Sequence, residues 1–241
     1  MIGSPRATTI GSSAPARGPA PSGSRRRLVV AAAIVAALLL VWLLFFSSLL
    51  GARTVTVTGT KLLTAQQVRA AADIAHGSPL IRLDTSAIAQ RIEKLPEVAS
   101  AEVSRSYPAT VRIKVIERVP VGYHQDGSVI TLVDATDVDI RTVAKIPSGT
   151  PRLERSNDQA VTDAIANVAG ALPHAVAAKT GSISAQTAES ITLHLTDGRS
   201  VMWGGTDNAA DKAALLPALL SQPGQYFDIS DPSAVIARQS N

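Results

Sequence analysis

One long apolar run near the start of the chain constrains its fold more than any other feature. Leu28 to Phe46 reads LVVAAAIVAALLLVWLLFF, nineteen residues without a charge, and with residues 47–50 the run reaches 23. At a rise of about 1.5 Å per residue, a helix of this length spans the ~30 Å hydrocarbon core of a bilayer. The sequence contains no second run of this kind. We therefore predict a single transmembrane helix over residues 28–50.

The charges that flank the run predict its orientation. Residues 1–27 hold five arginines and no acidic residue, and Arg25, Arg26 and Arg27 adjoin the run. Cationic flanks stay on the cytoplasmic side, so we expect a type II protein of the cell (inner) membrane whose residues 52–241 are exported. The alternative is a cleaved signal peptide, but its apolar region is typically only ~7–15 residues long. Residues 1–27 are rich in Gly, Ser and Pro, and we expect a disordered cytoplasmic tail.

Composition and motifs exclude several classes of function. Residues 53–241 hold 18 basic and 19 acidic side chains, so the high isoelectric point reflects the arginines of the tail. The sequence shows no cluster of cationic residues in the exported part, and we therefore do not predict nucleic-acid binding. The chain has no cysteine, its four histidines are scattered, and no Gly-x-Ser-x-Gly motif occurs. We predict no catalytic residue, no cofactor, no metal site and no small-molecule substrate.

The first exported segment has a β-α-α-β-β pattern. Residues 54–58 alternate as Thr-Val-Thr-Val-Thr, which is typical of a half-buried strand. Thr64 and Gln67 have the spacing of a capping box that opens a helix. A second helix is predicted to start at Asp84 or Thr85, and two strands follow over about 98–105 and 111–115.

Residues 121–241 are richer in strand signals. Asp126-Gly127 and Asp197-Gly198 are hairpin signals between alternating apolar residues. Helices are predicted from Asn157 and over about 207–220, where Pro217 should introduce a kink. Two last strands are predicted over 226–230 and 234–238. The fold class is therefore α+β: one transmembrane helix, a β-α-α-β-β module, and a mixed antiparallel β-sheet domain with helices.

These patterns resemble the FtsQ/DivIB family of cell division proteins, in which a POTRA module follows a single span. The resemblance covers about residues 28–237 and is carried by short stretches in a fixed order: Val55–Gly59, Leu95-Pro96-Glu97-Val98, Tyr107-Pro108, Ile113–Pro120, Leu132-Val133-Asp134 and Asp228–Pro232. One departure is that Asp137 occupies a turn where the family usually has glycine. Beyond the tail over 1–27 and the span over 28–50, the resemblance implies a POTRA-like domain over 52–120 and an FtsQ-type β domain over 121–241.

The resemblance also implies a function. Such proteins are scaffolds of the divisome at the division septum, without enzymatic activity, that bind small coiled-coil division proteins of the FtsB/FtsL (DivIC) type. An exposed sheet edge can pair with an extended partner segment, and the family places the partner near the last strands. We expect the backbone of 234–238 to act as the template and Tyr226 and Phe227 to act as apolar anchors, although one of these two should face the core because neighbours on a strand point to opposite sides. The predicted partner-binding residues are Tyr226, Phe227, Ile229, Ala234, Val235, Ile236 and Arg238.

Two other functions are compatible with an anchored, exported protein. One is a peptidoglycan hydrolase that uses an unrecognised carboxylate pair. The other is a POTRA-bearing secretion component, although such proteins normally carry serial POTRA modules and a β-barrel.

Overall fold

The computed structural model describes residues 23–46 and 51–238. Helix α1 (Gly23–Phe46) contains the apolar run through Phe46. Residues 1–22 of the predicted tail and 47–50 of the predicted span lie outside the described residues. Within the described ranges, no helix meets the length and hydropathy expected of a membrane-crossing segment. The span over 28–50 therefore stays a prediction.

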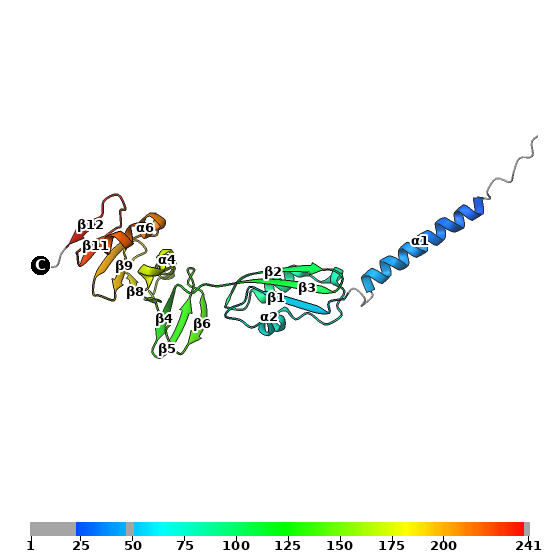
Figure 1. The fold of residues 1–241 in the computed structure, drawn as a ribbon, viewed down its shortest axis with the longest axis horizontal. Helices are drawn as coiled ribbons and strands as arrows, with labels where there is room; N and C mark the ends of the chain where they lie inside the picture. Colours follow the sequence, from blue (N-terminus) through cyan, green and yellow to red (C-terminus); the bar gives the residue numbers. More distant parts are fainter. Residues whose placement is uncertain (1–22, 47–50, 239–241) are drawn as a thin grey trace, which may run out of the picture.

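The predicted β-α-α-β-β order is confirmed in the segment that follows α1 (Figure 1). Its elements are β1 (Thr54–Thr58), α2 (Ala65–Ala72), the short 3-10 helix η2 (Leu80–Arg82), α3 (Thr85–Ile92), β2 (Val98–Ser106) and β3 (Thr110–Glu117). The strands form a sheet in the order β1-β3-β2, in which β1 is parallel to β3 and β2 is antiparallel to it. The helices cover one face, and Val68, Ile88 and Ile113 are among the buried residues between them and the sheet.

Local capping explains why these two helices begin where they do. The Thr64 hydroxyl accepts a hydrogen bond from the Gln67 N–H, and the Gln67 side chain accepts one from the Thr64 N–H, so the predicted capping box is present. The Asp84 carboxylate accepts from the Ala87 N–H and opens α3. Helix α2 ends at Asp73, whose backbone adopts a left-handed conformation with a φ of 46°.

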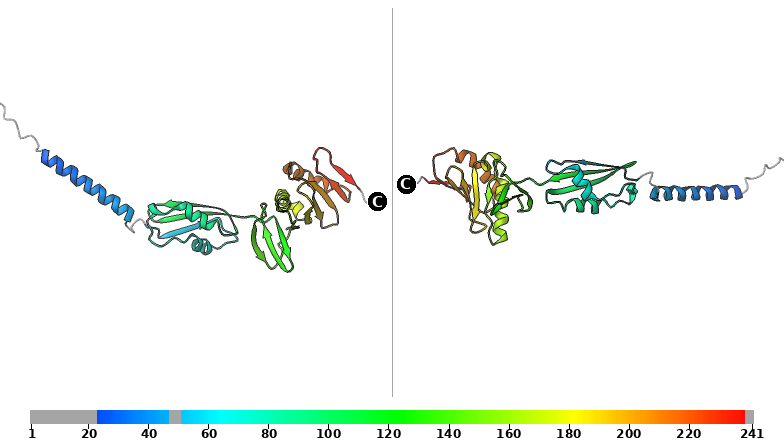
Figure 2. Two further views of the ribbon diagram at one scale, coloured as in Figure 1. Left: turned by 180° about the vertical axis from the view of Figure 1, so that it is seen from behind. Right: turned by 90° about the horizontal axis from the view of Figure 1, so that it is seen from below.

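The remaining strands form one nine-stranded sheet in the order β12-β11-β10-β9-β8-β7-β4-β5-β6. They are β4 (Gly122–Asp126), β5 (Val129–Val133), β6 (Asp139–Val143), β7 (Arg152–Leu153), β8 (Thr180–Ala185), β9 (Ile191–Leu195), β10 (Ser200–Gly204), β11 (Tyr226–Asp228) and β12 (Ile236–Arg238). The sheet is mixed, since the pairs β4–β7, β7–β8 and β10–β11 are parallel. Figures 1 and 2 show this sheet at the end of the molecule opposite α1.

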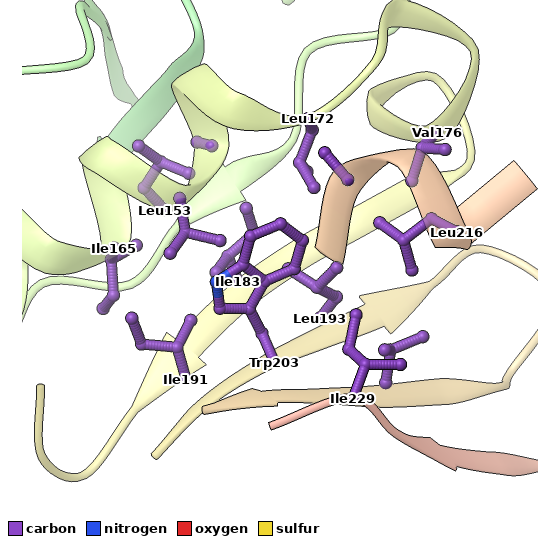
Figure 3. Packing of buried hydrophobic residues seen from close by; sticks show 14 of the residues in the cluster. Leu153, Ile165, Leu172, Val176, Ile183, Ile191, Leu193, Trp203, Leu216 and Ile229 are labelled. Atoms are coloured by element: carbon purple, nitrogen blue, oxygen red, sulfur yellow. The ribbon is translucent and has the colours of Figure 1, made fainter. Parts of the chain in front are cut away.

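Helices α4 (Gln159–Ala171), α5 (His174–Ala177) and α6 (Ala209–Leu219) pack on this sheet and form the larger core. Trp203 from β10 lies in the middle of that core, among Ile165, Leu193 and Leu216 (Figure 3). Helix α6 continues past Pro217 to Leu219. A smaller cluster of Tyr123, Leu132 and Ile140 lies at the β4-β5-β6 end of the sheet.

Candidate partner-binding edge

Strand β12 forms one edge of the nine-stranded sheet. It pairs with β11 in an antiparallel register that places Arg238 opposite Tyr226 and Ile236 opposite Asp228. All three residues of β12 are exposed. Because β12 is last in the strand order, its second edge is not used by any other described strand. A backbone edge of this kind can pair with an added strand.

The two predicted aromatic anchors point to opposite faces of β11. Phe227 is completely buried in the larger core, and Ile229 is equally buried. Tyr226 is only half-buried, and the Arg238 guanidinium lies 6.0 Å from the centre of its ring. Of the two aromatics, only Tyr226 is therefore available at the surface. Phe227 and Ile229 act as core residues because the alternation of the strand turns them toward the helices.

The other predicted site residues lie together at this edge. Ala234, Val235, Ile236 and Arg238 are all exposed, with Val235 and Ile236 leaving 39% and 45% of their surfaces open. Cross-strand pairing puts Ile236 and Arg238 on the same face of the sheet as Tyr226. Five of the seven predicted residues therefore lie on or next to this edge strand and are exposed or half-buried, and we call them the C-terminal edge: Tyr226, Ala234, Val235, Ile236 and Arg238.

Two consecutive Asp-x-Ser turns position this edge. The Asp228 carboxylate accepts hydrogen bonds from the N–H and hydroxyl of Ser230, at 3.0 and 2.6 Å. The Asp231 carboxylate accepts from the N–H and hydroxyl of Ser233, at 2.9 and 2.6 Å, and these bonds lower the pKa of Asp231. The Asp231 carbonyl also accepts from the Ala234 N–H. The repeated Asp-x-Ser spacing is the sequence signal that could have predicted this turn.

A buried lysine beneath this loop is the feature that sequence reasoning missed. Lys212 on α6 is 2% exposed, and its Nζ donates to the Gly205 carbonyl at 3.0 Å. Burial lowers the pKa of Lys212, and the negative charges of Asp207, Glu189 and Asp231 partly oppose that shift. In the sequence of α6 Lys212 stands next to Asp211 among alanines and leucines, so nothing in the sequence marks it as buried.

The comparisons with known proteins agree with the fold. A family model described as "POTRA domain, FtsQ-type" matches residues 50–118. The cell division protein FtsQ of Streptomyces collinus is 37% identical over 206 residues, which cover 78% of each chain. The chain belongs to the FtsQ family of cell division proteins. FtsQ of Mycolicibacterium smegmatis is 41% identical over 187 residues, or 76% of this chain and 56% of that protein, so the chain spans just over half the length of this relative.

A solved structure is also similar, the extracytoplasmic domain of the division protein DivIB from Geobacillus stearothermophilus. It is 19% identical, covers 44% of this chain and 92% of that domain, and has a TM-score of 0.34.

The departure from the FtsQ family pattern at residue 137 has a structural explanation. Asp137 has a φ of 58°, the left-handed conformation that glycine adopts most easily. Aspartate is one of the few other residues that tolerate this conformation. The turn that follows Asp134 therefore keeps a glycine-like backbone without a glycine.

Proposed function

We propose that the chain is a bitopic scaffold of the division machinery that binds a partner division protein at the C-terminal edge. In this proposal residues 1–27 are a cytoplasmic tail, 28–50 span the membrane, and 52–120 and 121–241 form two extracytoplasmic domains. The chain has no chemistry of its own, and it acts at the division septum by holding partners of the FtsB/FtsL (DivIC) type close to the membrane. Tethering of this kind raises the effective concentration of those partners.

The observation that carries the proposal is the exposed outer edge of β12. Membership of the FtsQ family supports the role in division. The strip around the edge combines exposed Val235 and Ile236 with the amphipathic Tyr226. Backbone pairing would supply affinity for an extended segment, and alternate side chains would supply specificity.

The first test is a hydrogen-exchange measurement on the chain in nanodiscs, with and without the extracytoplasmic segment of an FtsB/FtsL-type protein. Strand addition predicts saturable binding with new protection over 234–238. Saturable binding with protection confined to 54–117 would move the site to the β-α-α-β-β module. No binding at high micromolar concentration would overturn the proposal.

Proline substitutions at neighbouring positions sharpen the test. Consecutive N–H groups of a strand point to its two opposite edges, so Ile236→Pro and Ala237→Pro remove donors on different sides of β12. One variant should lose pairing with β11, whereas the other should keep that pairing and lose the partner. Unchanged affinity in both variants would contradict strand addition.

A further inference from the structure

The end of the three-stranded sheet nearest α1 gathers exposed cationic and apolar side chains. The register aligns Thr54 with Thr110 and Ser106 with Thr110, so the start of β1 and the end of β2 lie at this end. The Arg53 N–H donates to the Ala109 carbonyl at 2.9 Å, which joins residue 53 to the β2–β3 turn.

The loop before α3 reaches the same end. Arg105 donates from its guanidinium to the Leu83 carbonyl at 2.6 Å, so the segment that contains η2 lies against the end of β2. Gly51 forms an isolated β-bridge with Pro79, and the Ala52 N–H donates to the Ser78 carbonyl at 2.8 Å. The residues that enter the module from α1, the η2 loop and the β2–β3 turn therefore form one continuous surface.

This surface has the composition of a membrane-interface contact. Tyr107 is 59% exposed at the tip of the β2–β3 turn, and Ile81 on η2 is 41% exposed. Arg53, Arg82 and Arg105 are exposed around them. The acidic residues that flank the loop, Asp73 and Asp84, are exposed as well, so the arginines outnumber these carboxylates three to two, and Asp84 also caps α3. Tyrosine favours the headgroup region of bilayers, and arginines are attracted to anionic lipid headgroups.

We propose that this surface, which we call the membrane-proximal face, rests on the anionic headgroups of the bilayer that α1 enters. The proposal depends on the membrane span proposed above. Because the module is tied to the chain within a few residues of α1, the face is held at the height of the headgroups without further attachment. Contact at Tyr107 and Ile81 would fix the tilt of the β-α-α-β-β module relative to the membrane.

The test uses the full chain in vesicles, with a fluorophore on a single introduced cysteine. The native chain has no cysteine, so Ser106→Cys places one label beside Tyr107 and Ala99→Cys places a control label at the far end of β2. We expect quenching by headgroup-region spin-labelled lipids at residue 106 and not at residue 99. The quenching should require phosphatidylglycerol and should weaken in 1 M salt.

Charge removal tests the arginines directly. Each arginine removed from the face should lower the equilibrium constant for contact about fivefold, so Arg53→Gln with Arg82→Gln should nearly abolish quenching at residue 106. The matched control is Lys94→Gln, an exposed cation at the C-terminal end of α3, which should change nothing. Equal quenching in neutral and anionic vesicles, or equal quenching at residues 106 and 99, would overturn the proposal.

Carbonate extraction separates this proposal from the proposed span. If α1 spans the bilayer, the chain stays with the vesicles at high pH and high salt whether or not the face makes contact. A chain that resists extraction but shows no quenching at residue 106 would contradict the headgroup contact of the membrane-proximal face and leave the proposed span intact. A chain that is extracted would overturn the span, and with it the proposal that depends on it.

Discussion

The Nε2 atom of His124 lies 2.6 Å from Oδ1 of Asp137, and both side chains are more than nine-tenths buried. The other ring nitrogen, Nδ1, lies 2.9 Å from the Leu153 carbonyl. Both ring nitrogens therefore form a hydrogen bond with an oxygen atom, one to the Leu153 carbonyl and one to the Asp137 side chain. The pair joins β4 to β7 and to the turn between β5 and β6, where Gln159 adds one further bond to Asp137.

A double-mutant cycle tests this pair. His124→Phe leaves the Asp137 carboxylate buried without its main donor, and we expect a loss of about 3 kcal/mol in the free energy of unfolding. Asp137→Gly suits the left-handed φ but leaves the histidine without its acceptor, at a cost of about 1–2 kcal/mol. The double variant should lose at least about 1 kcal/mol less than the sum, because no unpaired carboxylate remains. Urea unfolding measures all three, and strict additivity would contradict the coupling.

The ion pair between Arg118 and Asp134 predicts a pH-dependent stability. The Arg118 Nη1 lies 2.6 Å from Asp134 Oδ2, and Thr136 and Val138 donate to Oδ1. Burial alone would raise the pKa of Asp134, but these hydrogen bonds outweigh it and hold that pKa below its usual value. The stabilisation is therefore complete above about pH 4, the unfolded value, and is lost as pH falls through the lower folded pKa.

We expect Asp134→Asn to lower the free energy of unfolding by about 2 kcal/mol at pH 7. The difference in the free energy of unfolding between the native chain and the variant should become smaller below about pH 4. Asp139→Asn is the matched control. Both side chains of the Asp139–Arg155 ion pair are about half exposed, so this pair should contribute less than about 1 kcal/mol to the free energy of unfolding. A gap that stays constant down to pH 2 would show that the carboxylate charge of Asp134 is not responsible.

The two aromatic residues of β11 should separate stability from binding. Phe227→Ala removes a fully buried ring and should cost about 3–5 kcal/mol of stability. Tyr226→Ala should cost less than about 1 kcal/mol but weaken binding of the FtsB/FtsL-type partner by about tenfold. Thermal unfolding and a binding titration on the same samples measure both effects. If the Tyr226→Ala variant binds the partner with native affinity, Tyr226 does not contribute to the binding site.

A tight backbone contact at Gly51 predicts how firmly the module is joined to α1. A Cβ added at Gly51 would lie 2.3 Å from the Gly77 carbonyl oxygen, so the backbone must move in Gly51→Ala. The Gly77 N–H donates to the Ala52 carbonyl at 2.8 Å, and we expect exchange of this amide to become at least about tenfold faster. Gly181→Ala is the control, because its nearest contact would be an ordinary 3.5 Å. If the Gly77 amide exchanges at the native rate in Gly51→Ala, the contact between residues 51–52 and 77 is already opened often in the native chain.

Sequence patterns predicted the β-α-α-β-β segment well because its signals are local. The capping box at Thr64, the cap at Asp84 and the alternation through Val111 and Val115 each act within a few residues. The nine-stranded sheet depends instead on β7, which is only two residues long. β7 pairs with both β4 and β8 and so joins two groups of strands. A strand so short has no detectable period, and its pairing is decided by packing.

The candidate edge was predictable as a region but not in its details. Alternation along β11 allowed only one aromatic to be core-facing, and packing on the helices selected Phe227. The burial of Lys212 was not predictable, because its hydrogen bond to Gly205 is made across a loop conformation that includes Gly204 at a φ of 79°.

The shortness of β12 has a consequence for self-association. A long, flat, apolar edge would let one copy of the chain add to the next without limit, which is how sheets seed aggregates. In the described part of the chain β12 is three residues long and includes Arg238, so it offers few backbone hydrogen bonds to a second copy. A lasting complex at this edge requires a partner that brings contacts of its own beyond the strand. We therefore expect the backbone of this edge alone to favour such a partner over a second copy of the chain.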